Sequence, residues 1–282
     1  MTHLQDFETI LRCPKEKGLI RFGKDAGECS ACGARYPLRE GKVFFTPPPP
    51  DAYAAPTIPS ERWSAWRKNN FHYFSRHLAG GEDKTLLDIG AGPSQFFAIT
   101  SRYHTHVGVD FYPYAGVQVI ADLTRPFPFA DGSFDVVFLS NVLEHISAPQ
   151  LFLAESYRVL RPGGMIIGTV PFLRDVHQAP YDFWRYTYIM LEQMLRKVGF
   201  GQIQIESVGT PFDALRVMQH MFFSRLLTAR FSKNRLINFS AVILARFARK
   251  ITHVLQLLYQ PMFSSLPPSL EFTEGYGFKG IK

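Results

Sequence analysis

The chain has 282 residues, 46% of them hydrophobic and 20% charged, and its formal net charge is +7. This length and apolar content allow one main domain with a sizeable core and smaller appendages, and the three cysteines, an odd number, argue against a disulfide framework. No N-terminal signal peptide is evident, and no apolar run reaches the ~18 to 20 residues that span a bilayer, so we expect a cytoplasmic protein.

Residues 1–45 carry the cysteines in the spacing of a small zinc ribbon. Cys13 and Glu16 occupy the first CxxC-like position, and Cys29 and Cys32 form the second. The flanking segments CPKEKGLI and ACGARYPLREGKVFF resemble zinc-ribbon-like proteins that serve as activator subunits of tRNA methyltransferases. Three thiolates and a carboxylate hold zinc less tightly than four thiolates, so two alternatives stay open: a weak zinc site, or a ribbon stabilised by its own small core.

A proline-rich segment, residues 46–61, follows the ribbon. Its six prolines and low apolar content predict an extended linker that marks a domain boundary before residues 62–282. Ser60 is predicted to cap a helix with an aromatic face that ends near Gly80.

Short β-rich runs then alternate with helical stretches. This alternation predicts an α/β fold, a mainly parallel, Rossmann-like doubly wound sheet with helices on both faces. Thr187 is a suitable N-cap and Gly199 a suitable stop for the last of these helices. The predicted strands are 85–89, 106–110, 117–121, 134–140, 165–170 and 202–208, and the predicted helices are 94–101, 148–160 and 187–198.

The segment LLDIGAGPS places a glycine turn directly after a buried strand. Gly90 and Gly92 let the backbone bend sharply and leave room for a cofactor. The third glycine of a nicotinamide-binding turn is replaced by Gln95, which disfavours NAD. Asp88 precedes the turn, and Asp110 ends the next strand at the distance where a carboxylate can accept both ribose hydroxyls.

Four motifs in order, LLDIGAG, VGVD, ADLTRPFPFADGSFDVVFLSNVLEHI and VLRPGG, resemble those of class I S-adenosylmethionine-dependent methyltransferases, in particular the type 11 group. The resemblance implies a seven-stranded sheet whose last strand, GYGFKGIK, is antiparallel. It also implies a cofactor site for S-adenosylmethionine, with Asp88, Gly90, Gly92 and Asp110 joined by Phe111 on the adenine face, Asp122 and Leu123 at the adenine amino group, and Asn141 on the methionine side.

Residues that orient or deprotonate a methyl acceptor are expected in two places. His145 follows the fourth predicted strand, and His177, Tyr181 and Asp182 lie in a polar and aromatic segment after the fifth. Similar H-x-x-P-x-D-x-W-R segments occur here in type 11 relatives. The structural alternatives are a packed or exposed histidine at position 145 and an ion pair between Asp182 and Arg185.

Residues 210–268 are an insertion before the last strand. They hold eight Lys and Arg residues and one acid, an excess equal to the net charge of the whole chain. Apolar residues such as Leu236, Ile243 and Phe247 recur at helical spacing, while Arg246 and Lys250 lie largely elsewhere on the helix. A basic amphipathic helix suits an anionic membrane surface, nucleic acid or a partner groove; the alternative is a helical lid packed on the domain.

Together these features predict methyl transfer to a small or lipid-linked acceptor, with a hydroxyl as the leading acceptor and peripheral contact with an anionic membrane. An RNA methyltransferase is the alternative enzyme, favoured by the ribbon and the basic insertion. The fourth strand lacks the Asn/Asp-Pro-Pro-aromatic signature of enzymes that methylate exocyclic amines in nucleic acid, which disfavours that substrate class. A non-catalytic binding scaffold is the alternative outside enzymes, and the intact glycine turn disfavours it.

Overall fold

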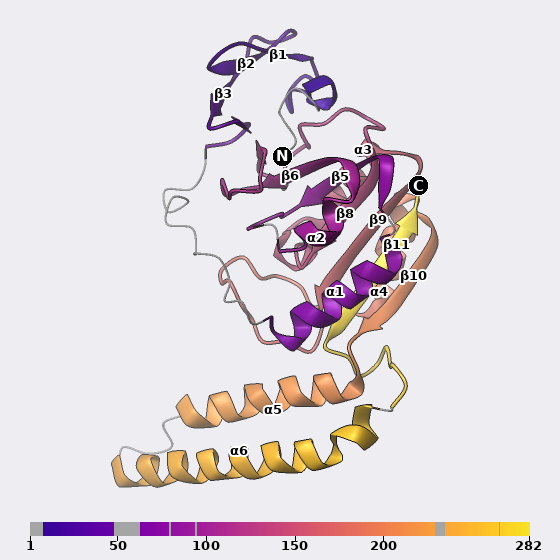
Figure 1. Ribbon diagram of the computed structural model, residues 1–282. Coiled ribbons are helices and arrows are strands. Elements are labelled where there is room, and N and C mark those ends of the chain that lie inside the picture. Colours follow the sequence, from indigo (N-terminus) through magenta and orange to yellow (C-terminus); the bar gives the residue numbers. More distant parts are fainter. Residues whose placement is uncertain (1–7, 48–62, 79, 94, 229–234, 265) are drawn as a thin grey trace.

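The computed structural model describes residues 8–47, 63–78, 80–93, 95–228, 235–264 and 266–282. Three parts are visible in Figure 1: a small β ribbon at one end, a central sheet with helices on its faces, and a helical hairpin at the other end. Most of the predicted linker lies outside the described residues, as does Ser60.

The central sheet has the order β7-β6-β5-β8-β9-β11-β10. Its strands from β7 to β9 are parallel, whereas β11 runs antiparallel to both β9 and β10. The Rossmann-like fold and the reversed last strand are as predicted, and the carboxyl ends of β5, β6 and β8 meet at one edge. The strands are β5 (Gly81–Ile89), β6 (Tyr103–Asp110), β7 (Val119–Ile120), β8 (Phe134–Ser140), β9 (Leu160–Pro171), β10 (Gly201–Val208) and β11 (Gly275–Ile281).

The ribbon enlarges this sheet beyond the seven strands predicted. Val43 and Phe44 pair in parallel with Val119 and Ile120, so the sheet has 11 strands. Leu11 is fully buried and bridges to Phe129, within a core that is continuous with the central sheet. The added elements are η2 (Glu8–Ile10), β1 (Ile20–Phe22), β2 (Ala26–Cys29), β3 (Arg35–Arg39) and β4 (Lys42–Phe44).

The helices agree with the predictions except near the N-terminus of the domain. Thr187 caps α4 through its side chain, and Gly199 ends it with φ of 116°. Ser64 caps the first described helix, because its hydroxyl accepts a hydrogen bond from the Arg67 N–H. The helix expected over 94–101 is only one turn long. The elements are α1 (Ala65–His77), α2 (Phe97–Thr100), η4 (Leu143–His145), α3 (Pro149–Val159) and α4 (Tyr188–Val198).

The insertion forms two helices, α5 (Pro211–Thr228) and α6 (Arg235–Ser264), that pack against each other as a hairpin. The hairpin extends away from the central sheet in Figure 1. None of the described helices combines the length and apolarity that crossing a membrane requires.

Candidate functional site

The turn after β5 depends on two glycines with left-handed backbone conformations. Gly90 has φ of 65° and Gly92 has φ of 52°. A Cβ at Gly90 would lie 2.5 Å from Val142 Cγ2, whereas a Cβ at Gly92 would meet nothing closer than the Gly90 carbonyl oxygen at 3.8 Å. Gly90 is therefore required by packing, and Gly92 leaves open space in which a ligand can approach the backbone.

Asp110 faces this turn from the end of β6. Its Oδ2 accepts a 2.9 Å hydrogen bond from the Gly92 N–H, and its Oδ1 accepts one of 2.9 Å from the Tyr112 N–H. Burial raises the pKa of Asp110, and these hydrogen bonds only partly oppose that effect. Phe111 is 39% exposed beside it. The carboxylate and the aromatic ring are thus placed next to the open side of the turn, which fits the ribose and adenine of the expected cofactor.

Asp88 differs from this arrangement. Its carboxylate is buried and lies 3.0 Å from His106 Nε2, which is equally buried on β6. Burial raises the pKa of Asp88, opposed by the hydrogen bond with His106. The structure therefore places Asp88 in a core pair. The contact with His106 was not predicted from the sequence. It depends on the register of β5 and β6, in which Asp88 lies opposite Gly108 and His106 is two residues away on the same strand as Gly108.

The other predicted cofactor residues lie at the same edge of the sheet. Asp122 accepts hydrogen bonds from the N–H and hydroxyl of Thr124, so it also caps a turn. Leu123 is 9% exposed. Asn141, which has φ of 55°, accepts a 3.2 Å hydrogen bond from Trp66 Nε1. This bond ties α1 to the edge where the carboxyl ends of the strands meet.

A second cluster joins η4 to the loop between β9 and α4. The Glu144 carbonyl oxygen accepts hydrogen bonds from the Phe183 and Trp184 N–H groups, which fix the loop against η4. The rings of His145 and His177 pack edge to face, with centroids 5.0 Å apart. The two histidines, predicted from separate segments, are therefore neighbours.

An ion pair between Asp182 and Arg185 lies beside these histidines. Arg185 holds Asp182 with hydrogen bonds of 2.6 Å and 2.8 Å, and these bonds lower the pKa of Asp182 to about 2. The ion pair considered from the sequence is therefore present, and His177 Nδ1 lies 3.2 Å from Asp182 Oδ2. Tyr181 is 67% exposed, and its carbonyl oxygen contacts His145.

Glu144 was missed in the sequence. Its side chain is fully buried, and burial raises its pKa to about 8. The NVLEH segment carried no signal for this burial, which arises from the loop that covers η4. Sequence spacing between segments far apart in the chain does not reveal such a contact.

The ribbon brings the thiols of Cys13, Cys29 and Cys32 within 4.8 Å of one another. Glu16, the predicted fourth ligand, is exposed, and the structure does not bring its carboxylate into this group. Tyr36 takes the inward place instead, with its hydroxyl 3.0 Å from Cys13 Sγ. Burial raises the pKa of the Cys13 thiol, but the Tyr36 hydrogen bond and backbone hydrogen bonds lower it overall to about 7. Three thiols fit a zinc ion only with a fourth ligand from elsewhere.

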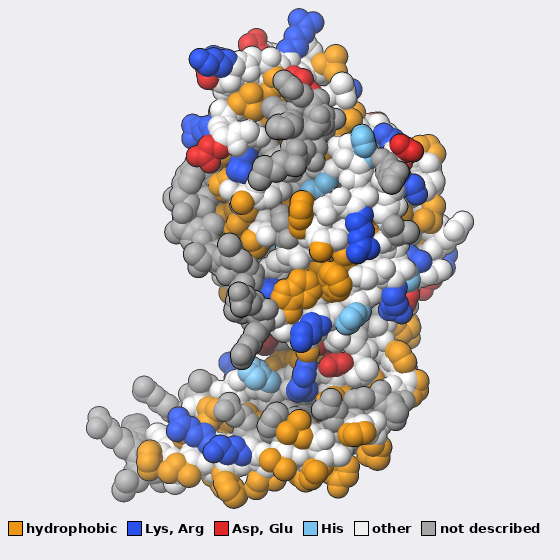
Figure 2. Space-filling view, viewed as in Figure 1, with side chains coloured by type: hydrophobic (Ala, Val, Ile, Leu, Met, Phe, Trp, Pro, Cys, Tyr) orange, Lys and Arg blue, Asp and Glu red, His pale blue; other side chains and the backbone are white. Residues whose placement is uncertain are grey.

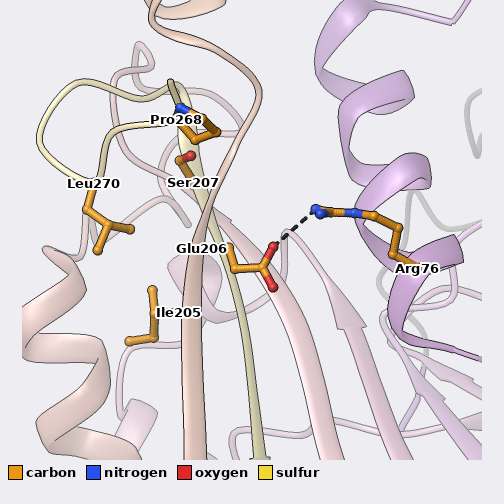
Figure 3. A pocket seen from close by; sticks show the side chains of 6 residues that line it. All are labelled: Arg76, Ile205, Glu206, Ser207, Pro268 and Leu270. Atoms are coloured by element: carbon orange, nitrogen blue, oxygen red, sulfur yellow. Dashed lines mark hydrogen bonds and ion pairs between the residues drawn. The ribbon is translucent and has the colours of Figure 1, made fainter. Parts of the chain in front are cut away.

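A pocket of about 260 Å³ lies elsewhere, on β10 at the end of the sheet. Arg76 reaches from α1 toward Glu206 of β10, as Figure 3 shows, and His77 also pairs with Glu206. The acid of this pocket is already neutralised within the fold, and the pocket is separate from the glycine turn. Its lining consists of Arg76, Ile205, Glu206, Ser207, Pro268 and Leu270.

Comparison with protein families places a known domain over this edge of the sheet. Residues 87–168 match a methyltransferase domain, Methyltransf_11. The matched segment runs from β5 into β9 and includes the glycine turn, Asp110 and η4.

The curated relatives that match this chain are also named as methyltransferases. A protein from Mycolicibacterium paratuberculosis strain K-10, named an uncharacterized methyltransferase, is 38% identical over 103 residues, which are 32% of this chain and 40% of the relative. A similarly named protein of Mycobacterium sp. strain KMS is 43% identical over 94 residues, 30% of this chain and 37% of the relative. The chain thus spans about two fifths of the length of these relatives. A solved SAM-dependent methyltransferase from Archaeoglobus fulgidus aligns with a TM-score of 0.47 and 16% identity, over 77% of this chain and 94% of that one.

Proposed function

Since residues 87–168 are a class I methyltransferase domain, whose cofactor is S-adenosylmethionine, we propose that this protein methylates a hydroxyl group of a lipid-linked acceptor at an anionic membrane surface. The observation that supports the transfer activity most strongly is the position of Asp110 beside the open Gly92 turn.

The cofactor part of the proposal assigns a task to each side of the turn. Asp110 would accept hydrogen bonds from the ribose hydroxyls, and Phe111 would cover the adenine. The open backbone at Gly92 would leave room for the methionine portion, with Asn141 at the adjoining strand end. When bound, S-adenosylmethionine supplies a methyl group on a positively charged sulfur that is already a good leaving group.

The chain itself must therefore align the acceptor and remove its proton. His145 and His177 are the side chains at this edge that suit proton removal, because a neutral imidazole nitrogen can accept a proton. Asp182 and Arg185 hold His177 in place through the bonds described above. The exposed Tyr181 and Trp184 offer aromatic surface for an acceptor.

The membrane part of the proposal rests on the outer face of α6. Phe247 is 61% exposed, Leu244 is 68% exposed and Leu258 is 69% exposed, although each is large and apolar. Hydrophobic side chains line the outer edge of the hairpin in Figure 2. Exposed apolar surface on this scale marks an interaction site. Leu236 belongs to the predicted stripe, but its side chain lies outside the described residues.

The neighbouring charges favour an anionic surface as the partner. Arg246 and Lys250 are exposed on the same helix. Each basic residue near an anionic surface contributes about 1 kcal/mol, and each apolar side chain that enters the acyl region contributes about 1.5 to 3 kcal/mol. A few such residues suffice for reversible binding to a membrane surface.

The substrate class is tested by incubating the protein with S-adenosylmethionine labelled on its methyl group, together with a bacterial membrane lipid extract or with total RNA. We expect label in the organic phase, as a methyl ether that resists alkaline hydrolysis. Asp110→Ala should abolish incorporation, whereas Asp131→Ala, at a side chain 79% exposed, should not.

The other outcomes identify the alternatives. Label in RNA would replace the lipid acceptor with a nucleic acid. Label released by alkali as methanol would indicate a carboxylate acceptor. No label in either extract, with cofactor binding intact, would favour the non-catalytic scaffold.

A further inference from the structure

Three groups that can each donate a lone pair face one another beside η4. They are a carboxylate oxygen of Glu144 and one ring nitrogen from each of His145 and His177, all within 4.8 Å of one another. Glu144 Oε1 lies 3.7 Å from His145 Nε2 and 4.0 Å from His177 Nε2. These separations exceed hydrogen-bonding distance, so the three groups do not satisfy one another.

The opposite nitrogen of each histidine is occupied. His145 Nδ1 lies 2.6 Å from the Tyr181 carbonyl oxygen, which can only accept a hydrogen bond. His177 Nδ1 lies 3.2 Å from the Asp182 carboxylate. The carbonyl contact places the proton of neutral His145 on Nδ1, so its Nε2 carries the lone pair that faces the cluster. The carboxylate beside His177 Nδ1 favours the same tautomer, and Arg185 Nη2 also lies 3.4 Å from that nitrogen.

No hydrogen bond among the described residues offsets the burial of the Glu144 carboxylate. Its side chain is fully buried, and within the described part of the chain neither carboxylate oxygen has a hydrogen-bond partner. Buried acids without partners are rare, because removing a carboxylate from water costs several kcal/mol. Arg185 contributes charge at longer range, but its guanidinium is bonded to Asp182.

We propose that Glu144, His145 and His177 bind a divalent first-row transition cation. A tetrahedral ion with bonds of about 2.1 Å requires donor atoms about 3.4 Å apart. The Glu144 oxygen would therefore have to approach the His145 and His177 nitrogens by about 0.3 Å and 0.6 Å. The cation satisfies the Glu144 carboxylate and both imidazole lone pairs at once.

The surrounding contacts match those of metal-binding histidines. A ligating histidine commonly donates its other N–H to a carboxylate or a carbonyl oxygen, which fixes the ring and its tautomer. Here Asp182 plays that part for His177, and the Tyr181 carbonyl oxygen plays it for His145. Arg185 in turn fixes Asp182 with two hydrogen bonds. Every ligand except Glu144 therefore has an outer partner.

Two nitrogens and one oxygen favour Mn²⁺, Co²⁺, Zn²⁺ or Fe²⁺ over Ca²⁺ and Mg²⁺, which prefer oxygen ligands. Three protein ligands also leave at least one coordination position open. The His177 side chain is 35% exposed, so the open position is accessible from solvent on that side. If the proposed function holds, a bound cation would replace His145 and His177 as the group that promotes proton loss, because both imidazoles would then be ligands. It would lower the pKa of an acceptor hydroxyl at the open position, and the proton would pass to water.

Manganese distinguishes this site from the three thiols of the ribbon, because thiolates favour softer ions. The full-length protein, first freed of metal with a chelator, is titrated with Mn²⁺ while electron paramagnetic resonance monitors the free ion. We expect one bound Mn²⁺ per chain and a rise in the melting temperature. Glu144→Gln and His177→Asn should each weaken Mn²⁺ binding at least tenfold, and Asp182→Asn should weaken it about 10- to 100-fold.

Two control variants complete the experiment. His104→Asn changes an exposed histidine on β6, and Cys32→Ser changes the exposed thiol of the ribbon. Both should bind Mn²⁺ as the wild type does. Absence of Mn²⁺ binding by the wild type, or equal binding by folded Glu144→Gln, would overturn the proposal. Because neither cofactor nor acceptor is present, this result is independent of the proposed methyl transfer.

Discussion

Gly90 and Gly92 both have a positive φ angle, but their surroundings differ. We therefore expect substitution of Gly90 to affect mainly stability, and substitution of Gly92 to affect mainly cofactor binding. A side chain at Gly90 would collide with Val142, whereas one at Gly92 would project into open space. The spacing of the two glycines was enough to predict the turn. The identity of the clashing residue was not predictable, because Val142 comes from the segment after another strand.

Gly90→Ala should lower the free energy of unfolding by about 2 to 4 kcal/mol, from the left-handed backbone and from overpacking. Gly92→Ala should cost only about 1 to 2 kcal/mol, from the backbone conformation alone, yet it should weaken S-adenosylhomocysteine binding more than tenfold. Denaturant unfolding and calorimetry measure the two effects. If Gly90→Ala combined with Val142→Ala is no more stable than Gly90→Ala, the collision is not the cause.

The raised pKa of Asp110 predicts how cofactor affinity depends on pH. The ionised carboxylate accepts the ribose hydrogen bonds, so affinity is full above the pKa of Asp110 and falls as the pH drops through it. Because burial raises this pKa, the loss should begin above the ordinary value of 3.8. Asp110→Asn should bind more weakly at neutral pH and show no such fall. Identical pH profiles for the two proteins would contradict this assignment.

Other residues of the site show what local sequence can and cannot reveal. The position of Asp110 beside the glycine turn was predictable, because the carboxyl ends of neighbouring parallel strands meet at one edge of the sheet. The pairing of Asp88 with His106 depends on strand register, and the burial of Glu144 depends on a loop folded over η4. Glu16 lies apart from the three thiols, because a CxxC-like spacing does not specify which way the side chain points.

Helix ends were predictable where the cap residue is unambiguous, as at Thr187 and Gly199. The amphipathic pattern of the insertion also predicted α6. The same pattern did not show whether the apolar face of the helix packs on the domain. In the structure, Ile243, Phe247 and Ile251 on that face are each at least 45% exposed. These three side chains therefore do not pack on the domain as a helical lid would require.

Arg246→Glu combined with Lys250→Glu should reduce flotation of the protein with anionic vesicles and leave its thermal stability unchanged. The reason is that both side chains are exposed and contribute attraction of about 1 kcal/mol each near an anionic surface. Flotation of the wild type should weaken at high salt and be slight with neutral vesicles. Arg21→Glu with Arg35→Glu makes the same change in charge on the exposed surface of the ribbon. Equal losses in the two double variants would refute a specific role for α6.

At the scale of the whole molecule, the ribbon and the central sheet form one hydrophobic core. Val43 is fully buried and pairs with Val119, which links β4 to the edge of the sheet. Cysteine spacing and the resemblance of the flanking segments predicted a small ribbon-like unit in residues 1–45. They did not predict its pairing with β7, because a two-residue strand such as Val119–Ile120 gives no signal of an available edge.

Val43→Ala should therefore destabilise the whole chain, by about 2 to 3 kcal/mol, through the cavity that it leaves. All three tryptophans, Trp63, Trp66 and Trp184, lie outside the ribbon, so their fluorescence reports on the remainder of the protein. We expect its melting transition to shift downward, whereas Val176→Ala, at a side chain 71% exposed, should leave it in place. An unchanged transition in Val43→Ala would mean that the ribbon folds independently.

Calorimetric binding of S-adenosylhomocysteine to the wild type and to Asp110→Ala shows directly whether the glycine turn and Asp110 form a cofactor site. The wild type should bind one molecule per chain and should not bind NAD, since Gln95 occupies the place of the third glycine. Loss of a charge-assisted acceptor should weaken binding by about 1.5 to 3 kcal/mol, tenfold or more, in Asp110→Ala. The control variant Asp131→Ala should bind normally. Absence of binding by the wild type, or equal affinity in Asp110→Ala, would mean that Asp110 and the glycine turn do not bind the cofactor.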